Sequence, residues 1–164
     1  MNVKVESPFI KLISLLNEVE SIVSSDKIQK MVFILKNEGV PFNEKYKYYP
    51  VGPYSSDLQL EVIDLIERNF FKTDGNIPQT IKINIRFKLE DDPDISEKKE
   101  LIKFLKNLDI FDLEIISTIY YLLDLGYMGE NQIKKKIKIL KPSLSKKLNS
   151  GYTNYEKIKE NYFG

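Results

Sequence analysis

The chain contains neither cysteine nor histidine, which removes most of the side chains on which enzymes depend. A thiol nucleophile, a Cys/His zinc site, a disulfide and a Ser-His-Asp triad are all impossible. Carboxylates cluster at Asp91, Asp92 and Asp94, but this stretch lacks the spaced ligands and the glycine of a calcium-binding loop. No phosphate-binding loop, dinucleotide glycine pattern or nucleophile elbow is present. The sequence therefore predicts a non-enzymatic protein with no catalytic residue, cofactor or metal site.

Basic side chains mark one face of an expected β-strand. Apolar and polar residues alternate over 81–89, which is the clearest strand pattern in the chain. Phe70–Thr73 is the expected partner, with a turn at Asp74–Asn76 between them. One face of this hairpin would carry Lys72, Lys82, Arg86 and Lys88. These side chains could contact the phosphate backbone of a nucleic acid, or they could be the solvated face of an amphipathic strand.

A second basic group lies near the C-terminus. Residues 131–164 hold nine lysines and two glutamates, a net charge of +7, whereas residues 1–130 hold 16 basic and 22 acidic side chains, a net charge of −6. Lys134, Lys135 and Lys138 belong to a helix expected at 130–140. Because no arginine is present there, the group could follow a phosphate backbone but could not recognise guanine by a bidentate contact. The alternative is a lysine-rich helix face that is simply solvated.

The segment Tyr46–Leu58 joins an aromatic extended stretch to a Gly-Pro turn and a helix start. As a structural turn, Gly52 would permit the reversal, Pro53 would fix φ, and a serine would cap the following helix. Ser56 has capping-box spacing to Gln59. As a binding site, the helix N-terminus would face a phosphate or a partner's carboxylate. The contacting side chains would then be Tyr54, Ser55 and Ser56, with Tyr48 in the preceding aromatic stretch.

Hydrophobic periodicity predicts a mainly helical α+β protein. A winged-helix-like unit at about 1–90 would pack against a helical unit at about 95–164, with the acidic stretch Glu90–Asp94 between them. The serines at 7 and 96 are expected to cap the first and fourth helices. The helix at 111–124 is apolar over much of its circumference and is expected to be central. Helices are expected at 7–22, 25–39, 55–69, 96–107, 111–124, 130–140 and 153–162.

Four segments together resemble the YwgA-like proteins of bacteria and archaea. They are Lys27–Leu35, Tyr48–Ser55, Asp112–Leu122 with its Leu-Glu pair, and Leu140–Pro142. The resemblance extends more distantly to the Panacea domain of SocA-like antitoxins. It implies a winged-helix-like core and a function in DNA-binding regulation or in antitoxin-type protein binding, and it implies no catalytic residue. About fifteen residues separate the second and third helices here, whereas a helix-turn-helix needs a turn of only three or four.

The leading hypothesis from the sequence is a DNA-binding protein of winged-helix type that regulates transcription by contacting double-stranded DNA. The alternative is a protein-interaction module, antitoxin-like or adaptor-like, that uses the same scaffold; it would expose an apolar or aromatic patch near Tyr46–Tyr54. A homodimer is compatible with either hypothesis. No secretory signal is recognised, and the apolar run Phe9–Leu16 is too short to span a membrane. A cytoplasmic protein without membrane contact is therefore expected.

Overall fold

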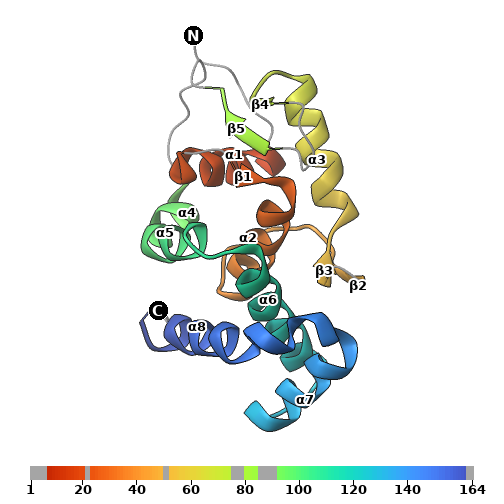
Figure 1. The fold of residues 1–164 in the computed structure, drawn as a ribbon. Coiled ribbons are helices and arrows are strands. Elements are labelled where there is room, and N and C mark those ends of the chain that lie inside the picture. Colours follow the sequence, from red (N-terminus) through yellow and green to blue (C-terminus); the bar gives the residue numbers. More distant parts are fainter. Residues whose placement is uncertain (1–6, 21–22, 50–51, 75–79, 85–91, 162–164) are drawn as a thin grey trace.

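The computed structural model describes residues 7–20, 23–49, 52–74, 80–84 and 92–161, and it shows a mainly helical α+β protein (Figure 1). Helices α7 and α8 form one end of the molecule, and strands β4 and β5 lie towards the other end, beside α1 and α3. The helices are α1 (Ser7–Val19), α2 (Ser25–Asn37), α3 (Ser56–Glu67), α4 (Pro93–Glu97), α5 (Lys99–Lys106), α6 (Ile110–Asp124), α7 (Glu130–Leu140) and α8 (Leu148–Asn161), with a 3-10 turn η1 (Pro142–Lys147) before α8.

A three-stranded antiparallel sheet contains β1 (Val23–Ser24), β4 (Phe71–Thr73) and β5 (Thr80–Ile83) in the order β1–β5–β4. The expected hairpin after the third helix is thus confirmed for its described part. The period-two pattern has its expected cause, because Phe71 and Ile81 are buried while Lys72 and Lys82 are exposed. Residues 85–89 of the predicted strand, and most of the predicted turn at 74–76, lie outside the described residues.

A second, two-stranded antiparallel sheet was not predicted. It pairs β2 (Lys47–Tyr49) with β3 (Gly52–Tyr54), inside the segment that the sequence indicated only as extended. Tyr49 lies opposite Gly52, which has a φ of +93°. The aromatic residues that flank the Gly-Pro pair are therefore the strands of a short hairpin.

Several predicted helix boundaries were wrong. The helix expected at 96–107 is two helices, α4 and α5, and Ser96 is not a cap. Asp92 caps α4 instead, because its Oδ1 accepts hydrogen bonds from the N–H groups of Asp94 (3.0 Å) and Ile95 (3.2 Å). Pro93 follows at the first helical position, which also favours a start there.

The ends of the first and last helices also differ from the prediction. The first ends at Val19 rather than at residue 22, and Glu20 has a φ of +57°. The side chain of Ser7, its expected cap, lies outside the described part. The last helix begins at Leu148 rather than at 153. It includes Gly151, where an added Cβ would lie 2.5 Å from Cγ2 of Ile115, so glycine there lets α8 pack closely on α6.

Helix α6 is central, as its apolar circumference predicted. Its Leu113 and Ile116 belong to a core cluster shared with α1, α2, α3, β5 and α5. Its Ile115 and Ile119 belong to a second cluster shared with α7, η1 and α8. The same helix therefore faces the N-terminal elements on one side and the C-terminal helices on the other (Figure 1).

Candidate functional site

Gln29 on α2 fixes the backbone of Ser55 by two hydrogen bonds. Its Nε2 donates to the Ser55 carbonyl oxygen (2.8 Å), and its Oε1 accepts from the Ser55 N–H (2.9 Å). Both residues are buried, so these backbone groups need partners inside the protein. The Tyr46 hydroxyl donates to the Gln29 carbonyl oxygen (3.0 Å). The side chain of Gln29 therefore pairs with both backbone groups of Ser55, as a neighbouring strand would, and it sets the position at which α3 begins.

Lys30, the next residue, is a buried ammonium group. Its Nζ donates to the carbonyl oxygen of Pro53 (3.1 Å). A Cβ on Gly52 would lie 3.0 Å from that Nζ and 3.3 Å from Cγ of Glu114. Burial lowers the pKa of Lys30 to about 8, and the Glu114 carboxylate opposes this shift. Glycine is required at position 52 both by its positive φ and by the close approach of these two charged side chains.

Glu114 extends this cluster to the C-terminal helices. Its carboxylate forms an ion pair with the ammonium of Lys141, and both side chains are largely buried. We name Lys30, Gly52, Pro53, Glu114 and Lys141 the junction cluster. Its members come from all four segments that carry the YwgA-like resemblance, and the cluster joins α2 and β3 to α6 and to the end of α7.

The aromatic residues near the Gly-Pro turn are mostly packed. The ring of Tyr48 lies 5.3 Å from that of Tyr121, and burial raises the pKa of the Tyr48 phenol. The Tyr49 and Tyr54 rings meet edge to face at 5.7 Å. Tyr49 is 41% exposed, and Tyr54 is half-buried. The aromatic patch expected of a protein-interaction module is therefore small among the described residues of this segment.

Ser55, rather than Ser56, caps α3. The Ser55 hydroxyl accepts a hydrogen bond from the N–H of Leu58 (3.1 Å), whereas Ser56 is exposed as the first helical residue. The capping-box spacing had indicated Ser56, one residue too late, because Gln29 fixes Ser55 as the last non-helical residue.

Ser55→Ala is expected to lower the free energy of unfolding by about 1 kcal/mol, because a buried helix N–H loses its acceptor. Ser56→Ala is the matched control and is expected to change it by less than about 0.5 kcal/mol. Urea unfolding of the two variants measures the difference. Equal effects of the two substitutions would contradict this assignment of the cap.

The structure describes only part of the basic face predicted on the hairpin. Lys72 and Lys82 lie directly opposite each other on β4 and β5, while Arg86 and Lys88 lie outside the described residues. Together with Asn17 and Glu20, the two lysines line a cavity of about 490 Å³. The Glu20 carboxylate and the C-terminal end of α1 partly balance the two ammonium charges. This pair is therefore a weak candidate for an anion site.

The three lysines predicted on the C-terminal helix are not equivalent. Lys134 forms an ion pair with Glu130 (2.6 Å) and lies over the ring of Tyr152. Lys135 and Lys138 are exposed, with no ion pair to any residue of the described ranges. Helix α7 and the hairpin lie at opposite ends of the molecule, so the two predicted basic groups do not form one continuous surface (Figure 1).

The outer face of α3 was not predicted from the sequence. Leu60 is 65% exposed and Ile63 is 42% exposed, although both are large aliphatic side chains. Acidic side chains surround them at Asp57, Asp64 and Glu67. Leu60 and Ile63 lie off the apolar face formed by Leu58, Val62 and Leu65, and this departure from helical periodicity was the available signal.

Glu44 and Glu61 bring two carboxyl groups together at the edge of α3. Glu44 precedes β2 and is buried, and one oxygen of each carboxyl group has no hydrogen-bond partner among the described residues. The proximity of the two groups favours one proton between them, because two adjacent carboxylates repel each other. Burial, the Glu44 carboxyl group and, more weakly, Asp57 raise the pKa of Glu61 to about 8.

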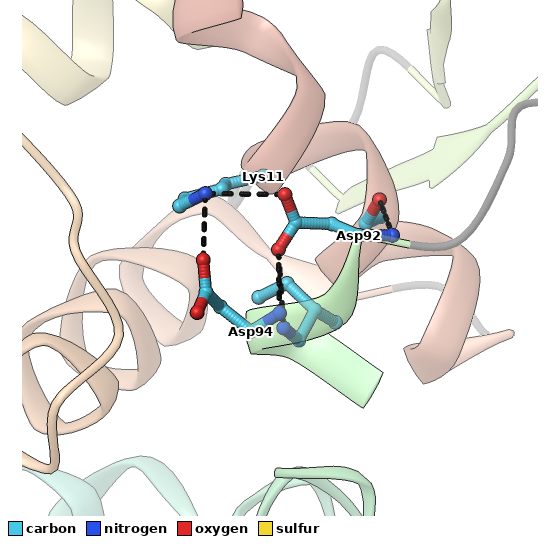
Figure 2. A network of polar contacts seen from close by, with 5 residues as sticks. Lys11, Asp92 and Asp94 are labelled. Carbon is cyan, nitrogen blue, oxygen red and sulfur yellow. Dashed lines mark hydrogen bonds and ion pairs between the residues drawn. The ribbon is translucent and has the colours of Figure 1, made fainter. Parts of the chain in front are cut away.

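The two carboxylates at the start of α4, Asp92 and Asp94, contact a lysine. The ammonium of Lys11 on α1 lies 3.1 Å from Oδ2 of Asp92 and 3.1 Å from Oδ2 of Asp94 (Figure 2). The N–H of Asp92 also donates to the hydroxyl of Ser14 (3.3 Å). These carboxylates thus fasten α4 to α1. Within the described ranges, no group of three or more carboxylates is arranged to hold a metal ion.

Comparison with curated proteins finds a relative over most of the chain. The chain is 29% identical over 154 residues to the uncharacterized protein YwgA of Bacillus subtilis strain 168, a match that covers 89% of this chain and 87% of the relative. The chain therefore resembles YwgA along most of its length. No family model matches it. No solved structure matches it either.

This similarity confirms the resemblance seen in the sequence, but it assigns no function, because that relative is itself uncharacterized. The more distant relation to the Panacea domain, the absence of enzymatic activity and the cytoplasmic location remain predictions. In the part of this YwgA-like chain that the structure describes, no helix combines the length and apolar character needed to cross a membrane.

Proposed function

We propose that this YwgA-like protein is a protein-interaction module, antitoxin-like or adaptor-like, whose α3 outer face binds a basic and partly apolar segment of a partner protein. The observation that carries the proposal is the composition of this face. Two exposed aliphatic side chains, Leu60 and Ile63, lie one turn apart within a rim of carboxylates. Apolar centres with polar rims are typical of protein interfaces.

The order of elements supports a winged-helix-like scaffold for this module. The chain runs α1, β1, α2, α3, β4, β5, with the sheet order β1–β5–β4, and the helices pack against the sheet. In DNA-binding proteins of helix-turn-helix type, the second helix of the motif enters the major groove. In such a scaffold α3 would be the corresponding helix, since it follows α2 and precedes the β4–β5 hairpin.

The charge of α3 favours a protein partner over DNA. Its outer face presents Asp57, Asp64 and Glu67, and the basic residue at its end, Arg68, forms an ion pair with Asp64 (3.3 Å). Carboxylates placed against phosphate groups repel them, whereas DNA affinity depends largely on cations that neutralise phosphates. A lysine- or arginine-bearing segment is the complementary ligand.

DNA binding remains the second proposal, and one observation favours it. Lys135 and Lys138 on α7 are exposed and have no ion pair in the described part of the chain. They could contact phosphate groups without reading bases, because no arginine accompanies them. Such binding would be non-specific and strongly salt-dependent.

Crosslinking from the α3 face tests the leading proposal. A photoreactive amino acid at position 60 is expected to capture a partner protein in cells that produce the chain, whereas the same amino acid at Met128, which is also exposed, is not. The purified partner should bind the Leu60→Ser, Ile63→Ser variant at least about tenfold more weakly than the unmodified chain. The matched control Leu125→Ser, Met128→Ser removes two other exposed apolar side chains and should bind normally.

Titration with duplex DNA over a series of salt concentrations tests the second proposal. If DNA binding is the main function, affinity should fall steeply as the salt concentration rises. The Lys135→Gln, Lys138→Gln variant should then reduce the slope of log affinity against log salt concentration by about two. Such a result, with no protein captured from position 60, would overturn the leading proposal. Normal partner binding by the Leu60→Ser, Ile63→Ser variant would overturn it as well.

A further inference from the structure

The outer face of α7 is basic and carries an exposed aliphatic side chain. Ile139 is 65% exposed, and the exposed Lys135 and Lys138 lie within one turn of it. Ile133 and Ile137 occupy the opposite, buried side of the helix. The acidic residue of α7, Glu130, lies at the N-terminus of the helix and forms an ion pair with Lys134. The outward face therefore combines an exposed aliphatic side chain with two neighbouring cations.

This face is the complement of the α3 outer face. Helix α3 presents Leu60 and Ile63 among carboxylates, and α7 presents Ile139 beside ammonium groups. The net charges of the two parts of the chain have the same signs as these two faces: −6 for residues 1–130 and +7 for residues 131–164. Attraction between opposite charges would bring the two faces together, and contact between the aliphatic side chains would then exclude water.

A single chain cannot bring these two faces together. Helix α3 lies beside the sheet at one end of the molecule, and α7 lies at the far end beyond α6 (Figure 1). The core clusters on either side of α6 hold these ends apart. Contact between the faces therefore requires two molecules.

We propose that the α7 outer face of one copy binds the α3 outer face of a second copy, head to tail. Such a contact is heterologous, so further copies can add until a ring closes. Each face is one helix surface, smaller than the standard interface of roughly 800 Å² per partner, so the association is weak and reversible. It covers the surface assigned above to an outside partner, which would then have to compete with it. The self-contact itself does not depend on that partner.

Charge reversal on each face provides the test. Sedimentation velocity of the purified chain, from about 10 μM to 1 mM, should show a mass that rises with concentration, and association should weaken at least about tenfold from low to high salt. Asp64→Lys, Glu67→Lys should abolish association because both faces are then basic. Lys135→Glu, Lys138→Glu should abolish it because both faces are then acidic. An equimolar mixture of the two variants should associate again, because each face then meets its opposite.

A matched variant separates this contact from the effect of net charge. Lys103→Glu, Lys157→Glu changes the net charge by the same amount at exposed positions on α5 and α8, and it should associate like the unmodified chain. A purely monomeric chain over the whole range, equal loss of association in this control, or failure of the mixture to associate would each overturn the proposal. Since only the purified chain is used, its failure is distinct from the absence of an outside partner.

Discussion

Gly52→Val is expected to lower the free energy of unfolding by about 2–4 kcal/mol. The φ of +93° at this residue is strained for any L side chain, which costs about 1–2 kcal/mol, and more when the side chain is β-branched. The new Cβ would also lie 3.0 Å from the buried Nζ of Lys30 and 3.3 Å from Cγ of Glu114. Moving either charged group disturbs the junction cluster, so the variant should unfold at lower urea concentration and lower temperature.

Gly39→Val is the control for the backbone part of this cost. Gly39 has a φ of +99°, close to that of Gly52, but a Cβ added at Gly39 would meet nothing within 4 Å. We expect Gly39→Val to lower the free energy of unfolding only by the cost of the strained backbone, about 1–2 kcal/mol. The excess for Gly52→Val therefore measures the packing of the junction cluster. Equal losses in the two variants would show that Lys30 and Glu114 move aside without cost.

The sequence predicted the turn at Gly52 and Pro53 but not what surrounds it. Glycine and proline have local conformational preferences that can be read from neighbouring residues. The contacts of Gly52 with Lys30 and Glu114 come from residues 22 and 62 positions away, and nothing in the local pattern indicates them. The resemblance to the YwgA-like proteins identified the four segments separately, and the fold shows that they meet.

Helices with a continuous apolar stripe were predicted most accurately. The bounds of α6 and α7 agree with the expected ranges to within one residue, because their buried residues follow helical spacing. The break between α4 and α5 at Lys98 was missed because apolar residues continue on both sides of it. The hairpin of β2 and β3 was missed because three-residue strands are too short to show alternation.

Burial determined which predicted site residues remain candidates. Ser55 and Pro53 are buried, so they hold the fold together and are not available to a ligand. Leu60 and Ile63 are residue types typical of a core, and the packing of α3 shows what their departure from helical periodicity only indicated, that they face outward. A sequence gives the types of side chain on a helix, but the neighbouring elements decide which side of that helix is covered.

The second large effect is expected at the carboxyl pair of Glu44 and Glu61. The raised pKa of Glu61, about 8, means that the folded protein holds a proton that the unfolded chain releases at about pH 4.5. Stability from this pair is therefore highest at low pH, falls as the pH rises from about 4.5 to about 8, and stays low above that. The charged groups nearby are Asp57, which adds to the repulsion, and Lys36, whose ammonium donates to the Glu44 carbonyl oxygen.

Glu61→Gln is expected to stabilise the protein by about 1–2 kcal/mol at about pH 8.5 and to have little effect at about pH 5. The full difference between the folded and unfolded pKa of Glu61 would correspond to a larger gain in the free energy of unfolding. Glu61 is half-buried, however, so water screens part of the repulsion. An amide keeps the shape and one donor of the protonated carboxyl group and removes the charge that must otherwise be buried beside Glu44. Urea unfolding of both proteins across this pH range measures the difference.

Glu67→Gln is the matched control for this experiment. Glu67 lies on the outer side of the same helix and is exposed, so its substitution changes the net charge equally without touching the carboxyl pair. Its effect on stability should be small and similar at both pH values. If Glu61→Gln and Glu67→Gln shift stability alike, or if the gain for Glu61→Gln is already present at about pH 5, the two carboxyl groups do not share a proton. The gain should grow from about pH 4.5 to about pH 8, where the folded protein holds a proton that the unfolded chain has released, and should level off above that.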